Sequence, residues 1–157
     1  MLQSYALAFL ISMVPLIELR GGVPVAMTMG IPAPIAIVVC AIGNMLPVPI
    51  VYLFARKVLV WGSTKKHIGP LFSKILTKGE KAGRKLASTA SRKGMFIALL
   101  LFVGIPLPGT GAWTGTLAAS LLNMGWKSTT GAVSLGVILA GIIMAIVSSL
   151  GLHIFGL

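Results

Sequence analysis

Residues 14–26, VPLIELRGGVPVA, most constrain what this chain can fold into, because charges and helix breakers interrupt an apolar stretch there. The apolar stretch covers residues 5–31, and ~20 apolar residues suffice to cross the ~30 Å of hydrocarbon in a membrane. Its centre holds two charged residues, Glu18 and Arg20. It also holds four residues that weaken or end a helix, which are Pro15, Gly21, Gly22 and Pro24. We therefore predict two short helical arms that meet inside a membrane instead of one straight membrane helix.

Residues 105–117, IPLPGTGAWTGTL, show the same pattern in the second half of the chain. This apolar segment is broken at its centre by Pro106, Pro108, Gly109 and Gly111. Broken hydrophobic segments at corresponding positions in two halves are typical of transporter binding sites. The two broken segments predict four helical arms, residues 7–14, 23–29, 95–103 and 114–122.

The composition indicates an all-α integral membrane protein. Hydrophobic residues make up 57% of the chain and charged residues 10%, whereas soluble domains carry roughly 25% charged residues. The only cysteine is Cys40, which excludes an intramolecular disulfide and a cysteine metal cluster. His67 and His153 are isolated, so no metal site is expected.

Basic residues concentrate in one part of the chain. Of the 13 Lys and Arg residues, 11 lie between Arg56 and Lys93. Such a cluster marks a cytoplasmic segment, and its place between membrane segments argues against nucleic-acid binding. Residues 66–91 combine apolar residues three and four apart with a separate lysine side, which predicts an amphipathic helix on the cytoplasmic interface. That helix would either contact anionic lipid or collect phosphate groups for a site.

We divide the chain into a first repeat (residues 1–60), a basic amphipathic connector (61–93) and a second repeat (94–157). The apolar runs at residues 35–55 and 129–152 are predicted to cross the membrane completely, the former with a proline kink. Small residues spaced four apart in the last run allow close helix packing, within the chain or in a homodimer.

Two topologies are compatible with this division. In the first, the broken segments are re-entrant hairpins in two inverted repeats, so that both termini lie outside and Lys127 lies inside. In the second, four plain crossings place both termini inside and Lys127 outside. The short arms and Lys127 favour the first topology.

The strings PLIELRGGVP and LLLFVGIPLPGTGAWTG resemble the small multidrug export family, over nearly the whole chain. This resemblance implies a membrane exporter of small molecules. Paired re-entrant hairpins with a buried acid and an arginine are more distantly similar to DedA-type proteins (SNARE-associated or VTT proteins). That likeness implies movement of undecaprenyl phosphate or other lipids, and proton-coupled transport.

A charged side chain inside a membrane indicates function by default, which makes Glu18 and Arg20 the leading site residues. In a functional role, Arg20 would bind an anionic group and Glu18 would bind a proton. Alternatively, the two residues only stabilise the turn. The opposing turn supplies amides, hydroxyls and a ring that could bind a substrate, or glycines that only allow close packing. Asn44 is a further candidate, which could cap or bond to a turn. The remaining candidate site residues come from the two broken segments, and they are Gly21, Gly22, Pro106, Pro108, Gly109, Thr110, Gly111, Trp113 and Thr114.

Three functions remain open from the sequence. The first is a small transporter or exporter of the inner membrane with a midplane site between the two turns, with or without coupling to protons. The second is a flippase for polyprenyl phosphate or phospholipid, and the third is a membrane scaffold without transport. We expect no cofactor, no nucleic-acid partner and no enzymatic activity.

Overall fold

The structure is a computed structural model that describes residues 2–74, 76–78, 81 and 91–155. Within these residues every regular element is a helix, which confirms the all-α prediction. The helices are α1 (Leu2–Met13), α2 (Glu18–Thr28), α3 (Ala33–Met45), α4 (Val48–Ser63), α6 (Arg92–Gly104), α7 (Ala112–Leu121) and α8 (Trp126–Phe155).

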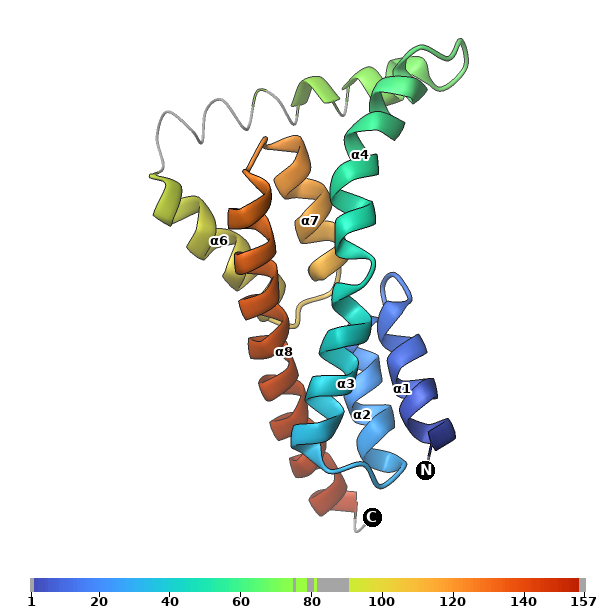
Figure 1. Cartoon of the computed structure of the whole chain (residues 1–157), viewed down its shortest axis with the longest axis vertical. Coiled ribbons are helices and arrows are strands. Elements are labelled where there is room, and N and C mark those ends of the chain that lie inside the picture. The colour runs from blue at the N-terminus through green and yellow to red at the C-terminus, as the bar shows by residue number, and fades with distance from the viewer. Residues whose placement is uncertain (1, 75, 79–80, 82–90, 156–157) are drawn as a thin grey trace.

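Two helical hairpins point toward each other from opposite ends of an elongated molecule (Figure 1). Helices α1 and α2 form the first hairpin, which packs on α3 and α8. Helices α6 and α7 form the second hairpin, which packs on α8 and, through α7, on α4. The turns of the two hairpins meet near the middle of the molecule (Figure 1). Their meeting point is therefore the place where distant parts of the chain come together.

Two helical segments run alongside the hairpins and are long and apolar enough to cross a membrane. They are Ala33–Ser63, with 31 residues, and Trp126–Gly151, with 26 residues. The first contains the predicted proline kink, because α3 ends at Met45 and α4 begins at Val48 after Pro47. Proline fits the first turn of α4, where a backbone N–H would have no partner within the helix.

The predicted centre of the first hairpin was wrong by several residues. The turn spans residues 14–17, so Gly21, Gly22 and Pro24 lie inside α2 instead of breaking it. The physical reason is packing between the arms of the hairpin. A Cβ on Gly22 would overlap the Ser12 hydroxyl of α1 and approach the Cys40 sulfur to 3.1 Å, so glycine allows the helices to approach closely. The arms of the second hairpin lie close to their predicted positions.

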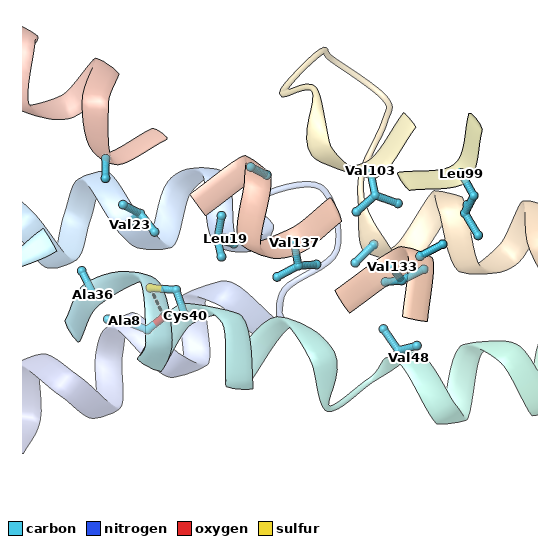
Figure 2. Packing of buried hydrophobic residues seen from close by; sticks show 14 of the residues in the cluster. Ala8, Leu19, Val23, Ala36, Cys40, Val48, Leu99, Val103, Val133 and Val137 are labelled. Carbon is cyan, nitrogen blue, oxygen red and sulfur yellow. Dashed lines mark hydrogen bonds between the residues drawn. The ribbon is translucent and has the colours of Figure 1, made fainter. Parts of the chain in front are cut away.

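The buried core follows α8 along both hairpins. Figure 2 shows Val137 of α8 toward Leu19 of α2, whereas Val133 lies toward Val103 of α6. A Cβ on Gly136 would lie 2.7 Å from the Val103 Cβ and 2.8 Å from a carbonyl oxygen of α6. The predicted small-residue stripe, Ala132, Gly136 and Ala140, is thus buried within the chain. The second predicted stripe is Gly141, Ala145 and Ser149, of which Ser149 is exposed, and a homodimer stays a prediction.

Apart from Arg20, the basic residues that the structure describes belong to the segments at one end of the molecule. The end of α4 lies at the end of the molecule where α8 begins with Trp126 and Lys127, opposite the start of α1 and the end of α8 (Figure 1). Residues 69–74 and 76–78 of the predicted amphipathic helix are helical. Most of its second half, including Lys85 and Leu86, lies outside the described residues.

Candidate functional site at the junction of the two hairpin turns

Glu18 stands at the end of the first turn in an unusual backbone conformation. Its N–H donates to the Val14 carbonyl at 3.0 Å, which closes the turn. Leu16 and Glu18 both have left-handed φ angles, of 74° and 52°. Such angles are uncommon for residues other than glycine and concentrate at functional sites. The turn directs the Glu18 side chain into the protein, where the residue is only 4% exposed.

The Glu18 carboxylate is bound by the first residues of α7. The Ala112 N–H donates to Oε2 at 3.1 Å, and the Trp113 N–H donates to Oε1 at 3.1 Å. Gly111 gives α7 no side-chain cap of its own. The first N–H groups of a helix lack partners within it, and the helix dipole favours negative charge there. Glu18 therefore caps α7 from a hairpin some ninety residues away in the chain.

Gly111 is required for this contact. Its φ angle of 139° is a conformation that L-residues rarely adopt. A Cβ at this position would overlap a Glu18 carboxylate oxygen and lie 2.7 Å from its Cδ. The absent side chain therefore provides the space that the carboxylate occupies.

Arg20 binds the other part of the second turn, residues 105–111. Its guanidinium donates to the Leu107 carbonyl through Nη1. Nη2 donates to the Thr110 hydroxyl at 2.6 Å and to the Ile105 carbonyl at 3.4 Å. The Thr110 hydroxyl lies 2.8 Å from the Leu107 carbonyl and 3.0 Å from that of Ile105. Arg20 thus holds the second turn through its hydrogen bonds, and its proposed role in binding an anion stays a prediction.

We call the set of Glu18, Arg20 and the residues 105–113 that they bind the junction. Beside it lies a cavity of about 470 Å³, which we call the Glu18 cavity. One wall comes from the first turn (Pro15, Leu16 and Glu18), and another from α4 (Ile50, Val51, Phe54, Ala55, Val58 and Leu59). The third wall comes from the second turn and α7, and it consists of Gly109, Thr110, Trp113, Thr114 and Leu117.

The Glu18 cavity is apolar except at its junction side. Among the described residues that line it, Glu18 is the single ionisable one. Thr110 and Thr114 contribute hydroxyls, although the Thr114 hydroxyl lies 3.4 Å from the Gly111 carbonyl and can bond there. The Trp113 ring nitrogen is buried and has no hydrogen-bond partner among the described residues. An apolar space with a few polar groups on one side is typical of small-molecule sites.

The structure brings together some predicted site residues and separates others. Five of them line the Glu18 cavity, namely Glu18, Gly109, Thr110, Trp113 and Thr114. Arg20 and Gly111 shape the junction from outside the cavity wall, and Pro106 and Pro108 belong to the second turn without lining the cavity. Gly22 faces α1 and α3, and its neighbour Gly21 lies against Ile17, so neither contacts the cavity.

Asn44 also lies apart from the Glu18 cavity. It is 2% exposed on α3, and its Oδ1 has no hydrogen-bond partner among the described residues. The predicted bond of Asn44 to a turn stays a prediction.

The α4 wall was missed by the sequence analysis. Its residues, such as Ile50, Phe54 and Val58, recur at three and four along the helix. This spacing marks one helix face, but apolar residues also cover the lipid-facing sides of a membrane helix. The spacing therefore predicts that these residues share one side of the helix, but it does not show whether that side lines a cavity or contacts lipid.

A family model described as putative small multi-drug export protein matches residues 18–143. The chain belongs to the small multi-drug export protein family. The matched region begins at Glu18 and includes Arg20, α4 and the complete second hairpin. Family membership and the two long apolar helices support the prediction of a membrane protein. No curated protein and no solved structure matches the chain, and the more distant likeness to DedA-type proteins stays a prediction.

Proposed function

We propose that this member of the small multi-drug export family is a multi-pass inner-membrane transporter whose substrate binds in the Glu18 cavity. The observation that carries the proposal is the position of Glu18. A buried carboxylate of one hairpin binds the backbone of the other hairpin, next to a space large enough for a small molecule. Small-molecule sites commonly have volumes of ~300–1,000 Å³. The export direction comes from the family description.

In this proposal the two hairpins are re-entrant and belong to inverted repeats. Helix α1 has 12 residues and α7 has 10, so at ~1.5 Å per residue neither reaches across ~30 Å of hydrocarbon. Each hairpin would enter from its own side and turn back near the midplane. Irregular backbone at that depth is tolerated when protein surrounds it, and the junction supplies partners for both turns.

The orientation follows from the basic residues. With the connector in the cytoplasm, Lys127 also lies on the cytoplasmic side, while the start of α1 and the end of α8 lie outside (Figure 1). The first hairpin would then open to the outside and the second to the cytoplasm. This arrangement suits alternating access, in which one repeat rocks against the other around a fixed site.

Glu18 offers a way to couple this movement to protons. The carboxylate form accepts two amide hydrogens of α7 in charge-assisted bonds, which are about twice as strong as neutral ones. A proton that binds to a Glu18 oxygen removes the negative charge and weakens both bonds. The first hairpin can then separate from α7, and the proton leaves when the carboxylate reaches the other side. We expect no further chemical step.

The hydrogen bonds that Arg20 makes within the protein favour a small molecule over a lipid phosphate as substrate. A phosphate would need free guanidinium donors, whereas Arg20 donates to Leu107, Thr110 and Ile105. Binding of a phosphate by Arg20 would therefore require the second turn to give up these contacts. A flippase for polyprenyl phosphate is the less favoured transport function for this reason.

Uptake into inverted membrane vesicles tests the proposed transport. Vesicles from cells that overproduce the protein are given a panel of labelled small molecules, with and without an acidic interior. We expect at least one compound to accumulate in response to the pH difference, and Glu18→Gln to abolish this response. The matched control Ile146→Ala changes an exposed side chain of α8 outside the Glu18 cavity, and it should transport normally. Accumulation that is equal in the Gln variant would remove Glu18 from the coupling mechanism.

A further inference from the structure

We propose that the Glu18 cavity binds a lipophilic monocation, whose charge pairs with the Glu18 carboxylate while its apolar body lies against α4. This inference names the substrate class of the proposed transporter and in that sense rests on the proposed function. Binding itself requires no transport, so the two can be tested separately.

Of the two charged residues at the junction, Glu18 lines the Glu18 cavity and Arg20 does not. Glu18 lines the cavity, whereas Arg20 is bound to carbonyls of the second turn and is not among the lining residues. Each Glu18 oxygen accepts one backbone hydrogen, from Ala112 or Trp113. A carboxylate has about four acceptor positions, so acceptor capacity remains for a cation in the cavity. A ligand therefore meets the Glu18 carboxylate at the cavity wall, whereas the Arg20 guanidinium, which is close enough to interact electrostatically with Glu18, does not line the cavity.

The remaining walls suit the body of such a cation. Ile50, Phe54 and Val58 form an apolar face on α4, and Trp113 stands on the α7 side. Burial of apolar ligand surface against these residues is favourable, and the faces of aromatic rings attract cations. An apolar molecule with one positive charge therefore satisfies both sides of the cavity.

Ligands of other charge fit less well. An anion would be placed beside the Glu18 carboxylate among mostly apolar residues, where like charges repel each other. It would also have to compete with Arg20's own partners Leu107 and Thr110. A neutral apolar molecule or a lipid tail would fit the α4 wall, but its binding would not depend on Glu18.

Tetraphenylphosphonium and tetraphenylborate test the charge, because they have nearly the same shape and opposite charge. Equilibrium dialysis of the purified full-length protein in an uncharged detergent measures both ions, with protein-free detergent subtracted. We expect the cation to bind about tenfold more tightly than the anion, and Glu18→Gln to remove this difference. The control Ile146→Ala should retain it.

A second pair of variants keeps the proposal testable if Glu18→Gln disturbs the junction. Val58 lies on the α4 wall, is 49% exposed and makes no junction contact. Val58→Lys should weaken binding of the cation severalfold and Val58→Glu should strengthen it, because both variants introduce a long charged side chain and differ in the sign of the charge.

The possible outcomes distinguish this inference from the proposed function. Tighter binding of tetraphenylborate, or binding of both ions that none of the substitutions alters, would overturn the cation inference and leave transport of another substrate class open. Absence of binding by either ion would overturn it as well. Charge-selective binding of the cation without transport in vesicles would support the inference and contradict the proposed transport.

Discussion

The two hairpin turns meet, but they contribute different parts of the chain to the contact. The first turn, residues 14–17, is short, and it is followed directly by the charged side chains of Glu18 and Arg20. The second turn, residues 105–111, is longer and contributes mainly backbone, with the Thr110 hydroxyl as its polar side chain in the contact. Side chains of one hairpin thus satisfy backbone groups of the other. Without the first hairpin, the carbonyls of Ile105 and Leu107 and the N–H groups of Ala112 and Trp113 would lose these partners.

The two turns therefore have different roles in the contact, although the arms of the two hairpins pack in a similar way. Each hairpin brings its arms together at a glycine, Gly22 against Ser12 in the first and Gly115 against Val103 in the second. The similarity lies in the packing of the arms, and the functional difference lies in the turns. Variants that act on one turn or one pair of arms can therefore separate the two contributions.

The largest effect is expected from Gly111→Ala. A Cβ at φ 139° is strained, at a cost of about 1–3 kcal/mol. It would also displace the Glu18 carboxylate from Ala112 and Trp113, and hydrogen bonds to a charged group contribute about 1.5–3 kcal/mol each. We expect a loss of about 4 kcal/mol in unfolding free energy, measured by titration of mixed micelles with a denaturing detergent.

Gly109→Ala is the matched control for this effect. Gly109 also has a left-handed φ, of 80°, but a Cβ there would have nothing within 4 Å. This variant should lose only about 1 kcal/mol, from backbone strain. Equal losses in the two variants would mean that the overlap with Glu18 contributes nothing, and that the second turn tolerates a displaced carboxylate.

Much of the helical framework could be predicted from the sequence, because it depends on local properties. The length of the apolar runs predicted the two long helices, and Pro47 predicted the kink between α3 and α4. The arms of the second hairpin were predicted well because prolines and glycines mark its turn. The first turn was misplaced because the same residue types can also serve packing, and Gly22 serves it against Ser12.

The site was predictable only in part, because the sequence identifies unusual side chains but not the backbone groups that they bind. Glu18 and Arg20 stood out because charge is rare inside apolar segments. Their partners are backbone groups of the second hairpin, and a backbone amide leaves no signature in the sequence. The sequence therefore indicated which side chains matter, but it could not tell that Glu18 faces a cavity while Arg20 does not.

A smaller loss is expected when the guanidinium of Arg20 is replaced by an ammonium. Arg20→Lys keeps the positive charge, but a lysine ammonium lacks the planar fork that reaches Leu107, Thr110 and Ile105 together. We expect a loss of about 2 kcal/mol in the same denaturation assay.

A double-mutant cycle sharpens this prediction. Thr110→Val removes the hydroxyl that accepts from Nη2 at 2.6 Å. In the Thr110→Val background, Arg20→Lys should cost less than in the native protein, because part of the contact is already lost. Strictly additive losses would indicate that Arg20 does not stabilise the second turn through Thr110.

The smallest effect is expected where the arms of the first hairpin approach each other. Gly22→Ala places a methyl group against the Ser12 hydroxyl, and it should cost roughly 1–2 kcal/mol, as overpacking commonly does. Ser12→Ala removes the overlapping oxygen and leaves its Cβ 3.2 Å from the new methyl group, which a small shift can relieve. Gly22→Ala should therefore be less costly in the Ser12→Ala background. An unchanged cost would show that Cys40, 3.1 Å from the same position, limits the approach of the arms instead.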